Sequence, residues 1–322
     1  MIKASIIVPT FNRGYILGEA IQSILDQTYP HFELIIVDDG STDDTADVVN
    51  SFKDERIHLI RHPKNRGAAA ARNTGLAAAQ GDLISFLDSD DPWSPDKLAL
   101  EVRFLTDHPE ADAVFTDLRI EGAAAVPSVF RICPVFSKFL ASTSAFDGVM
   151  VPRRTMYLCM LQEMPIRIQA TTIRRQALSD GAKFQEDWPP CEDWEFLLRF
   201  ARTHCLGFID RPLVTRRILS DSILSQHLKT DAFLLTKMFI REKQALRGDR
   251  EAVAAVRQAI AAVSSKLGYC YRDDGEYLDS VRAFLRGFRE SGDFRLLARV
   301  VALPIPRRLR KQIKRLAKAM SL

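Results

Sequence analysis

The stretch GDLISFLDSDD, residues 81–91, runs a mostly apolar segment directly into three carboxylates, those of Asp88, Asp90 and Asp91. The segment 83–87 is apolar enough to form a buried strand. Like charges held close together repel one another, and burial makes it more costly to keep them ionised. The three carboxylates therefore predict a positively charged partner at the end of this strand.

Outward from this stretch, the first 120 residues alternate short apolar runs with segments of helical period. Continuous apolar strands separated by helices indicate a parallel sheet covered on both faces. The expected strands are 4–9, 32–41, 57–62, 82–87 and 111–118, and the expected helices are 14–27, 43–52 (capped by Ser41 or Thr42), 67–80 and 94–108.

The pattern changes further along the chain. Residues 121–165 are rich in proline and predict irregular connections with an inserted helix. A strand running into a helix is expected over 168–178, and an amphipathic helix over 191–203. After about residue 220 the sequence is helical almost throughout, which predicts a separate C-terminal region.

Composition excludes several classes of protein. With 47% hydrophobic and 27% charged residues, the chain is an ordinary globular one. We expect no transmembrane helix, because no run of about 18 apolar residues occurs. The N-terminus does not resemble a signal peptide, so we expect a cytoplasmic protein. The five cysteines are scattered without a CxxC pair, which argues against a zinc site or a disulfide framework.

Acids end two of the predicted strands, with Asp38 and Asp39 after one and Asp88 and Asp90 after another. Ligands of open parallel sheets bind outside the carboxyl ends of strands. Alternation along a strand places Asp88 and Asp90 on the same side. Magnesium commonly takes one or two carboxylates together with substrate phosphates, so a metal ion carrying a diphosphate is the expected partner. A solvated turn that caps the next helix is the alternative.

Four motifs occur in order: VPTFNRG at 8–14, VDDGSTDDT at 37–45, NRGAAAARNTGL at 65–76 and FLDSDD at 86–91. Together they resemble the family 2 glycosyltransferases, which have the GT-A fold. The resemblance is close over residues 3–120 and extends loosely to about 217. It implies a GT-A catalytic domain over 1–218, an α/β domain with a mainly parallel central sheet, followed by an α-helical region over 219–322.

The resemblance also implies roles for single residues. In this family the loop after the first strand holds the nucleotide base, the DDGS motif recognises the base edge, and the DxD motif contacts the sugar and a metal. The implied nucleotide-binding residues are Pro9, Thr10, Phe11, Asp38, Asp39, Arg72 and Asp88, and Asp90 is implied to bind Mg²⁺ or Mn²⁺. The alternatives are that Phe11 is a core residue, that Arg72 pairs with a surface acid, and that Asn12 and Gly40 only form turns.

The segment EDWEFLLR at 192–199 resembles the ED motif of the same family, which implies that Asp193 is the catalytic base. Glu192 is the second candidate for this role. Acids in the first turn also stabilise a helix by its dipole, which is the alternative. The similar EDW at 186–188 is not followed by a helix, because two prolines interrupt it. Arg174 or Arg175 is expected on the acceptor and diphosphate side.

The implied function is a metal-dependent, inverting glycosyltransferase of the hexosyltransferase type. It would move a sugar from a nucleotide-diphosphate sugar to a hydroxyl of a glycan or lipid-linked acceptor, in cell-surface polysaccharide or lipid-linked glycan synthesis. One alternative is a nucleotidyltransferase, although the expected glycine-rich phosphate loop is missing after the first strand. The other is a non-catalytic nucleotide-binding scaffold with the same fold.

The C-terminal region carries two further signals. The stretch 267–288 is similar to one tetratricopeptide repeat, and one repeat predicts a helical hairpin rather than an array. From residue 307 the tail holds seven basic residues and no acidic one, with apolar residues on one helical face. Such a helix can lie on an anionic membrane, so peripheral membrane contact is expected. Nucleic-acid binding is not expected, because the tail has no interleaved aromatic residues.

Overall fold

The computed structural model describes residues 1–122, 125–141, 143, 148–178, 181–188, 191–218, 228–246 and 248–303. The chain divides into two compact units, Met1–Ser220 and Asp221–Leu322. The predicted basic tail from residue 307 lies outside the described residues. The boundary at 218 between a catalytic domain and a helical C-terminal region stays a prediction.

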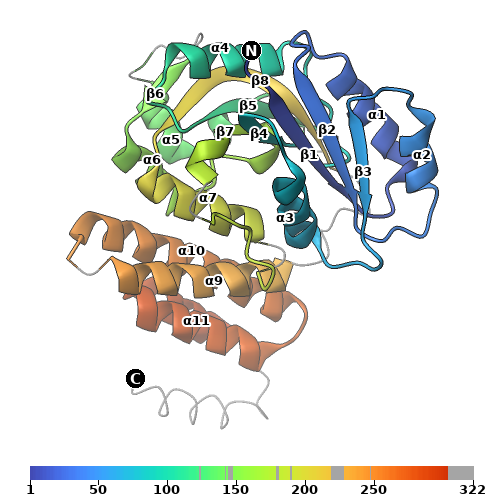
Figure 1. The fold of residues 1–322 in the computed structure, drawn as a ribbon. Coiled ribbons are helices and arrows are strands. Elements are labelled where there is room, and N and C mark those ends of the chain that lie inside the picture. Colours follow the sequence, from blue (N-terminus) through green and yellow to red (C-terminus); the bar gives the residue numbers. More distant parts are fainter. Residues whose placement is uncertain are drawn as a thin grey trace. The chain divides into compact units, whose positions relative to one another are not determined.

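An eight-stranded sheet in the order β3-β2-β1-β4-β7-β5-β8-β6 forms the centre of the first unit (Figure 1). Strands β1 to β4 pair in parallel, and so do β5 and β8, whereas β7 and β6 run antiparallel to their neighbours. This confirms the predicted, mainly parallel α/β sheet. The strands are β1 Ala4–Thr10, β2 Phe32–Asp38, β3 Ile57–Arg61, β4 Leu83–Phe86, β5 Ala113–Glu121, β6 Val149–Val151, β7 Thr171–Arg174 and β8 Leu206–Arg217.

Helices surround this sheet, and α3 packs directly on β1 and β2 (Figure 1). The α-helices of the first unit are α1 Gly14–Leu25, α2 Thr45–Ser51, α3 Ala68–Ala78, α4 Lys97–Asp107, α5 Pro134–Leu140, α6 Arg153–Met160 and α7 Glu192–Thr203. Three 3₁₀ turns are η1 Phe130–Ile132, η2 Ile168–Ala170 and η3 Arg175–Leu178. The helix predicted after the strand of 168–178 is therefore only the short turn η3.

One local prediction near the site is wrong, because neither Ser41 nor Thr42 caps α2, whose N-cap position is Asp44. The Ser41 hydroxyl instead accepts a hydrogen bond from the Asn12 backbone N–H at 2.8 Å. Strand β1 extends one residue beyond its predicted end at Pro9, to Thr10. Pro9 is tolerated because β4 pairs with β1 only as far as Ile7, so no strand needs the missing N–H.

Close packing of α3 on β1 depends on Gly75, where a Cβ atom would lie 2.4 Å from Ile7 Cγ2. We expect Gly75→Ala to destabilise the protein by about 1–3 kcal/mol, the usual cost of overpacking a core. Gly18→Ala in α1 is the matched control, because its Cβ would have no neighbour nearer than 3.9 Å. This control should gain up to about 1 kcal/mol of helix stability. Urea unfolding of both variants tests the contrast, and equal effects would contradict it.

The second unit contains the helices α9 Leu228–Ala245, α10 Arg250–Asp273, α11 Tyr277–Ser291 and α12 Phe294–Ala302. Helices α10 and α11 form a hairpin in which the Ser280 hydroxyl donates to the Gly268 carbonyl at 2.7 Å. A Cβ atom on Gly268 would lie 2.4 Å from the Phe284 ring, so small residues are needed at this crossing. The resemblance of this hairpin to one tetratricopeptide repeat stays a prediction.

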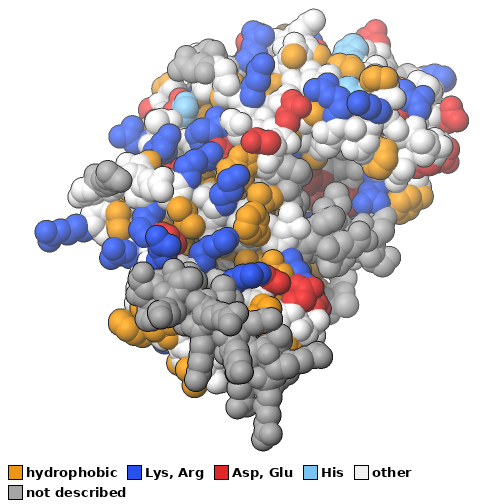
Figure 2. All heavy atoms as spheres, turned by 90° about the horizontal axis from the view of Figure 1, so that it is seen from below, with side chains coloured by type: hydrophobic (Ala, Val, Ile, Leu, Met, Phe, Trp, Pro, Cys, Tyr) orange, Lys and Arg blue, Asp and Glu red, His pale blue; other side chains and the backbone are white. Residues whose placement is uncertain are grey.

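Charged side chains of both signs lie on the described surface. On the face seen in Figure 2, Lys and Arg side chains lie among hydrophobic, acidic and uncharged ones. None of the described helices combines the length and the apolar character that a membrane crossing requires.

Candidate active site

The carboxyl ends of β1 and β2 meet at Asp38 and Asp39, as the sequence predicts. Asp38 is fully buried, and its carboxylate accepts a hydrogen bond from the Ser41 N–H at 2.8 Å. Its other oxygen lies 3.1 Å from Arg61 Nε. These contacts fix the turn that follows β2.

Asp39 joins the end of β2 to the loop before α3. Its backbone N–H donates to the Thr10 carbonyl at 2.8 Å. Its carboxylate accepts hydrogen bonds from the backbone N–H groups of Arg66, at 2.9 and 3.0 Å, and of Gly67, at 2.7 Å. The ring of His62 lies 2.7 Å from the same carboxylate. Asp39 therefore holds the NRG loop next to the end of β1.

The residues after β1 separate into turn formers and one exposed ring. Asn12 has a φ of 52°, and its side-chain oxygen accepts from the Thr42 N–H at 2.8 Å. Gly40 has a φ of 81°, and a Cβ atom there would lie 2.7 Å from the Lys64 backbone. Both residues shape turns. Phe11 is 41% exposed, so it is not a core residue and its ring is open to a base.

Arg72 connects the two acidic motifs. Its Nη2 donates to Asp88 Oδ1 at 2.9 Å, and its Nη1 donates to Glu192 Oε1 at 2.8 Å. The guanidinium also lies over the Phe184 ring, 5.5 Å from its centroid. Burial by itself would lower the pKa of Arg72, but the two carboxylates raise it well above its ordinary value. The alternative of a surface ion pair is wrong, because only 6% of the Arg72 side chain is exposed.

The loop that contains Phe184 packs against Arg72, and the sequence did not predict this contact. The Asn73 side chain donates to the Phe184 carbonyl and accepts from its N–H, both at 2.9 Å. The Phe184 ring stacks on Phe196 of α7 with centroids 4.2 Å apart. Because Asn73 follows Arg72 directly, one turn of α3 holds both this loop and the acidic motifs. The asparagine in the AARN motif was the available signal.

Asp193 lies in the first turn of α7, next to the bound Glu192. Burial, and then the Glu192 carboxylate, raise its pKa to about 6, while Arg72 and Arg167 oppose the shift. Among the described residues, the carboxylate accepts a hydrogen bond only from the backbone N–H of its neighbour Trp194, at 2.7 Å. Glu192 is held by Arg72, so Asp193 is the more available of the two acids.

The carboxylates of the opening stretch have different surroundings. Burial, and then Asp88, raise the pKa of Asp90. Asp91 is buried, and it accepts from Gln169 Nε2 at 3.2 Å and from the Arg217 N–H at 3.0 Å, so it is a structural residue. Asp88 and Asp90 remain half-buried.

A cation bound at Asp90 would need further ligands from a substrate. Within the described residues, no group of three or more His, Cys, Asp or Glu side chains could hold a metal ion by itself. A magnesium or manganese ion that is also bound by a diphosphate needs only one or two carboxylates. The raised pKa of Asp90 fits a carboxylate that a cation would stabilise.

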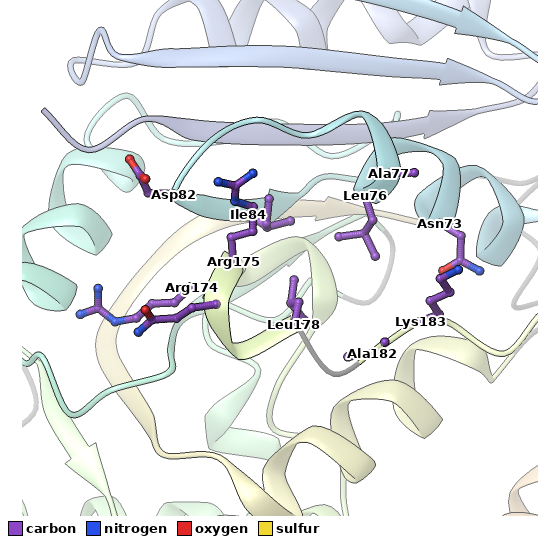
Figure 3. A pocket seen from close by; sticks show the side chains of 12 residues that line it. Asn73, Leu76, Ala77, Asp82, Ile84, Arg174, Arg175, Leu178, Ala182 and Lys183 are labelled. Carbon is purple, nitrogen blue, oxygen red and sulfur yellow. The ribbon is translucent and has the colours of Figure 1, made fainter.

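A cavity of about 670 Å³ lies elsewhere, and Figure 3 shows its lining. Asp82 and Ile84 contribute from the start of β4, and Arg174 and Arg175 from the end of β7. Arg174 pairs in register with Leu83, so this cavity lies at the opposite end of β4 from Asp88. The expectation that Arg174 or Arg175 lies on the acceptor and diphosphate side is therefore wrong, since both line this cavity.

Comparisons with known proteins agree on the family. A family model described as Glycosyl transferase family 2 matches residues 5–178. An uncharacterized glycosyltransferase of Rickettsia felis is 46% identical over 219 residues, which is 67% of this chain and 33% of that protein. The UDP-Glc:alpha-D-GlcNAc-diphosphoundecaprenol beta-1,3-glucosyltransferase WfaP of Escherichia coli is 40% identical over 133 residues, which is 40% of this chain and 51% of that protein.

The chain thus spans between a third and about half of the length of these two relatives. Among solved structures, S. aureus TarS 1–349 in complex with UDP-GlcNAc matches with a TM-score of 0.64 at 21% identity, over 92% of this chain and 83% of that one. The mannosyltransferase PcManGT from Pyrobaculum calidifontis, with GDP-Man and Mn²⁺, matches with a TM-score of 0.58 at 20% identity, over 97% and 83%. These two likenesses show the GT-A type fold. By its fold and by the match over residues 5–178, the chain belongs to glycosyltransferase family 2.

Proposed function

We propose that this protein is an inverting glycosyltransferase that uses a nucleotide-diphosphate sugar and needs a divalent cation. The observation that carries the proposal is the pair of hydrogen bonds that the Arg72 guanidinium donates, to Asp88 at 2.9 Å and to Glu192 at 2.8 Å. It brings the end of β4 and the start of α7 to one place. A sugar donor at Asp88 and an acceptor at Asp193 would therefore be neighbours.

The donor side is built from the strand ends. We propose that Phe11 stacks on the nucleotide base, beside Pro9 and Thr10 of β1. Asp38 and Asp39 support this side by fixing the turn after β2 and the loop before α3. Arg72 and Asp88 lie nearest to the sugar and its diphosphate. This arrangement supports the nucleotide-binding roles that the family resemblance implies for these residues.

The reaction needs one proton transfer by the chain. Asp193 takes the proton of the acceptor hydroxyl as that oxygen attacks the anomeric carbon, and the bond from this carbon to the diphosphate breaks. Glu192, held by Arg72, keeps the start of α7 in place. Asp90 would hold the cation, which when bound supplies charge neutralisation for the diphosphate. One displacement inverts the anomeric centre.

The acceptor class follows from the relatives. WfaP is named as acting on a diphosphoundecaprenol-linked sugar. We propose an acceptor of the same class, a lipid-linked glycan used in cell-surface polysaccharide synthesis. The predicted membrane contact of the tail from residue 307 would suit such an acceptor.

Calorimetric titration with UDP, GDP and dTDP, with and without Mn²⁺, tests the donor site. We expect one nucleotide to bind tightly only with the metal, and Asp90→Asn to lose at least tenfold in that affinity. Asp96→Asn, at a half-exposed acid just before α4, is the matched control. A folded protein that binds none of the three nucleotides would contradict the proposal.

The pH dependence of turnover follows from Asp193. A base works when ionised, and burial raises the pKa of this carboxyl to about 6. We therefore expect kcat/KM to fall about tenfold for each pH unit below 6 and to be level above it. The profile should be measured at saturating metal. A profile that stays level down to pH 4.5 would contradict the assignment of the base.

A further inference from the structure

Arg167 is a cation near Asp193 that has no anionic partner in the described part of the chain. It is half-buried and directly precedes η2. Its Nε atom is buried without a hydrogen bond, and its Nη1 lies 3.2 Å from the Met164 sulfur. A thioether is a weak acceptor, whereas a guanidinium has five N–H donors to satisfy. Most of the hydrogen-bonding capacity of Arg167 is therefore unused.

A second arginine lies next to it. Asp91 accepts from Gln169 Nε2 at 3.2 Å and from the Arg217 N–H at 3.0 Å. Gln169 is two residues after Arg167, and Arg217 directly follows Arg216, so one buried carboxylate ties both arginine-bearing segments together. The described residues provide no ion pair for Arg216 either.

Charged neighbours of Arg167 and Asp90 act on the pKa values of both groups. Burial, and then Arg216, lower the pKa of Arg167, while Asp193 opposes this. Burial, and then Asp88, raise the pKa of Asp90, and Arg13 and Arg216 oppose this rise. Arg216 therefore acts electrostatically on both Arg167 and Asp90, and Arg167 acts on Asp193.

A purely structural role does not account for Arg167. Arg174, an arginine that does stabilise the fold, donates from Nε to the Ala111 carbonyl at 2.7 Å and from Nη2 to the carbonyls of Leu105 and His108. Arg167 makes no comparable set of bonds. Two close guanidinium groups with free donors repel each other and lower stability unless an anion binds between them.

We propose that Arg167, together with Arg216, binds a phosphate group of a substrate beside Asp193. This inference rests on the proposed function. The fork of a guanidinium matches phosphate oxygens, and two such groups can hold a diphosphate. That diphosphate has two sources, the nucleotide-sugar donor and a lipid-diphosphate acceptor.

Stability distinguishes this role from a structural one. Arg167→Gln removes an unpaired cation and keeps most of the stem, so we expect the Tm of the ligand-free protein to stay equal or rise. Arg167→Lys keeps the charge but loses the fork, and it should recover only part of the binding. Arg153→Gln, at an exposed arginine in the first turn of α6, is the matched control.

The test is calorimetric titration of the full chain with inorganic pyrophosphate, first in metal-free buffer without nucleotide and then in buffer with Mn²⁺ and a saturating concentration of the nucleotide that wild type binds. We expect wild type and Arg153→Gln to bind pyrophosphate, and Arg167→Gln to bind at least tenfold more weakly. If pyrophosphate still binds beside the nucleotide, the arginines serve the acceptor; if the nucleotide displaces it, they serve the donor.

Equal pyrophosphate binding by wild type and Arg167→Gln, or no binding by wild type, would overturn the inference. So would a lower Tm of Arg167→Gln with a matching loss of folded protein. The proposed function is tested separately within the same experiment. If wild type binds a nucleotide while Arg167 proves irrelevant, only this inference fails; if it binds no nucleotide, the proposed function fails.

Discussion

Asp193→Asn should reduce kcat by about 10²–10⁴-fold and leave nucleotide binding within twofold of wild type. The amide has nearly the same shape but cannot accept the proton of the acceptor hydroxyl. The side chain is next to Glu192, which Arg72 holds at 2.8 Å, so the start of α7 should keep its position. Initial rates at saturating donor and acceptor, with calorimetry of the nucleotide, measure both effects.

The same variant should change stability with a definite sign. Burial raises the pKa of Asp193 from an ordinary value of 3.8 to about 6, so the folded protein resists its ionisation. Stability is therefore lost as the pH rises through this range. Asp193→Asn should melt at a higher temperature than wild type at pH 7.5 and at the same temperature near pH 3.5.

Asp187→Asn is the control for both measurements, because Asp187 is an exposed acid in the similar EDW stretch. It should leave kcat and Tm unchanged. Full activity of Asp193→Asn would exclude the base role, and Glu192→Gln would then be the next variant to assay.

Arg72→Gln should be the most damaging change to folding at the site. It leaves Glu192 and Asp88 without the cation that binds both, and 10% of the Glu192 side chain and 33% of the Asp88 side chain are exposed. Removing one partner of a buried ion pair costs about 3–5 kcal/mol, and the partial exposure of Asp88 favours the lower end. We also expect at least tenfold weaker nucleotide binding, because Asp88 and α7 lose their common anchor.

Arg66→Gln is the matched control for Arg72. Arg66 lies just before the same helix and pairs with Glu186 at 3.3 Å, and both side chains are about half exposed. Surface ion pairs contribute less than about 1 kcal/mol. Urea unfolding should separate the two variants by at least twofold in free energy. Similar losses would mean that the bridge from Asp88 to Glu192 does not hold the site together.

The sequence predicts the strand ends well because hydrophobic runs and the acids that follow them are local signals. Asp38, Asp39 and Asp88 all lie where the five apolar runs place them. Strands β6 and β8 were missed, since β6 has three residues and β8 contains Arg211 and Pro212. Periodicity carries no signal in such segments.

Pairing between distant residues could not be predicted. Arg72 and Glu192 are separated by 120 positions, so no local pattern in the sequence links them. The hydroxyl of Ser41 shows the same limit on a small scale, because a turn 29 residues away takes the group that was expected to cap α2. Arg167 belongs to no sequence motif, and only its buried Nε atom without a hydrogen bond indicates that it could bind a ligand.

The anomeric configuration of the product tests the central claim most directly. The nucleotide sugar that carries the bound nucleotide should be incubated with Mn²⁺ and an N-acetylglucosaminyl diphosphate bearing a short alkyl chain, and the product followed by NMR. The account predicts release of one nucleoside diphosphate per sugar transferred and an inverted anomeric centre, with both lost in Asp193→Asn. A product that retains the donor configuration, or transfer that persists unchanged in Asp193→Asn, would contradict it.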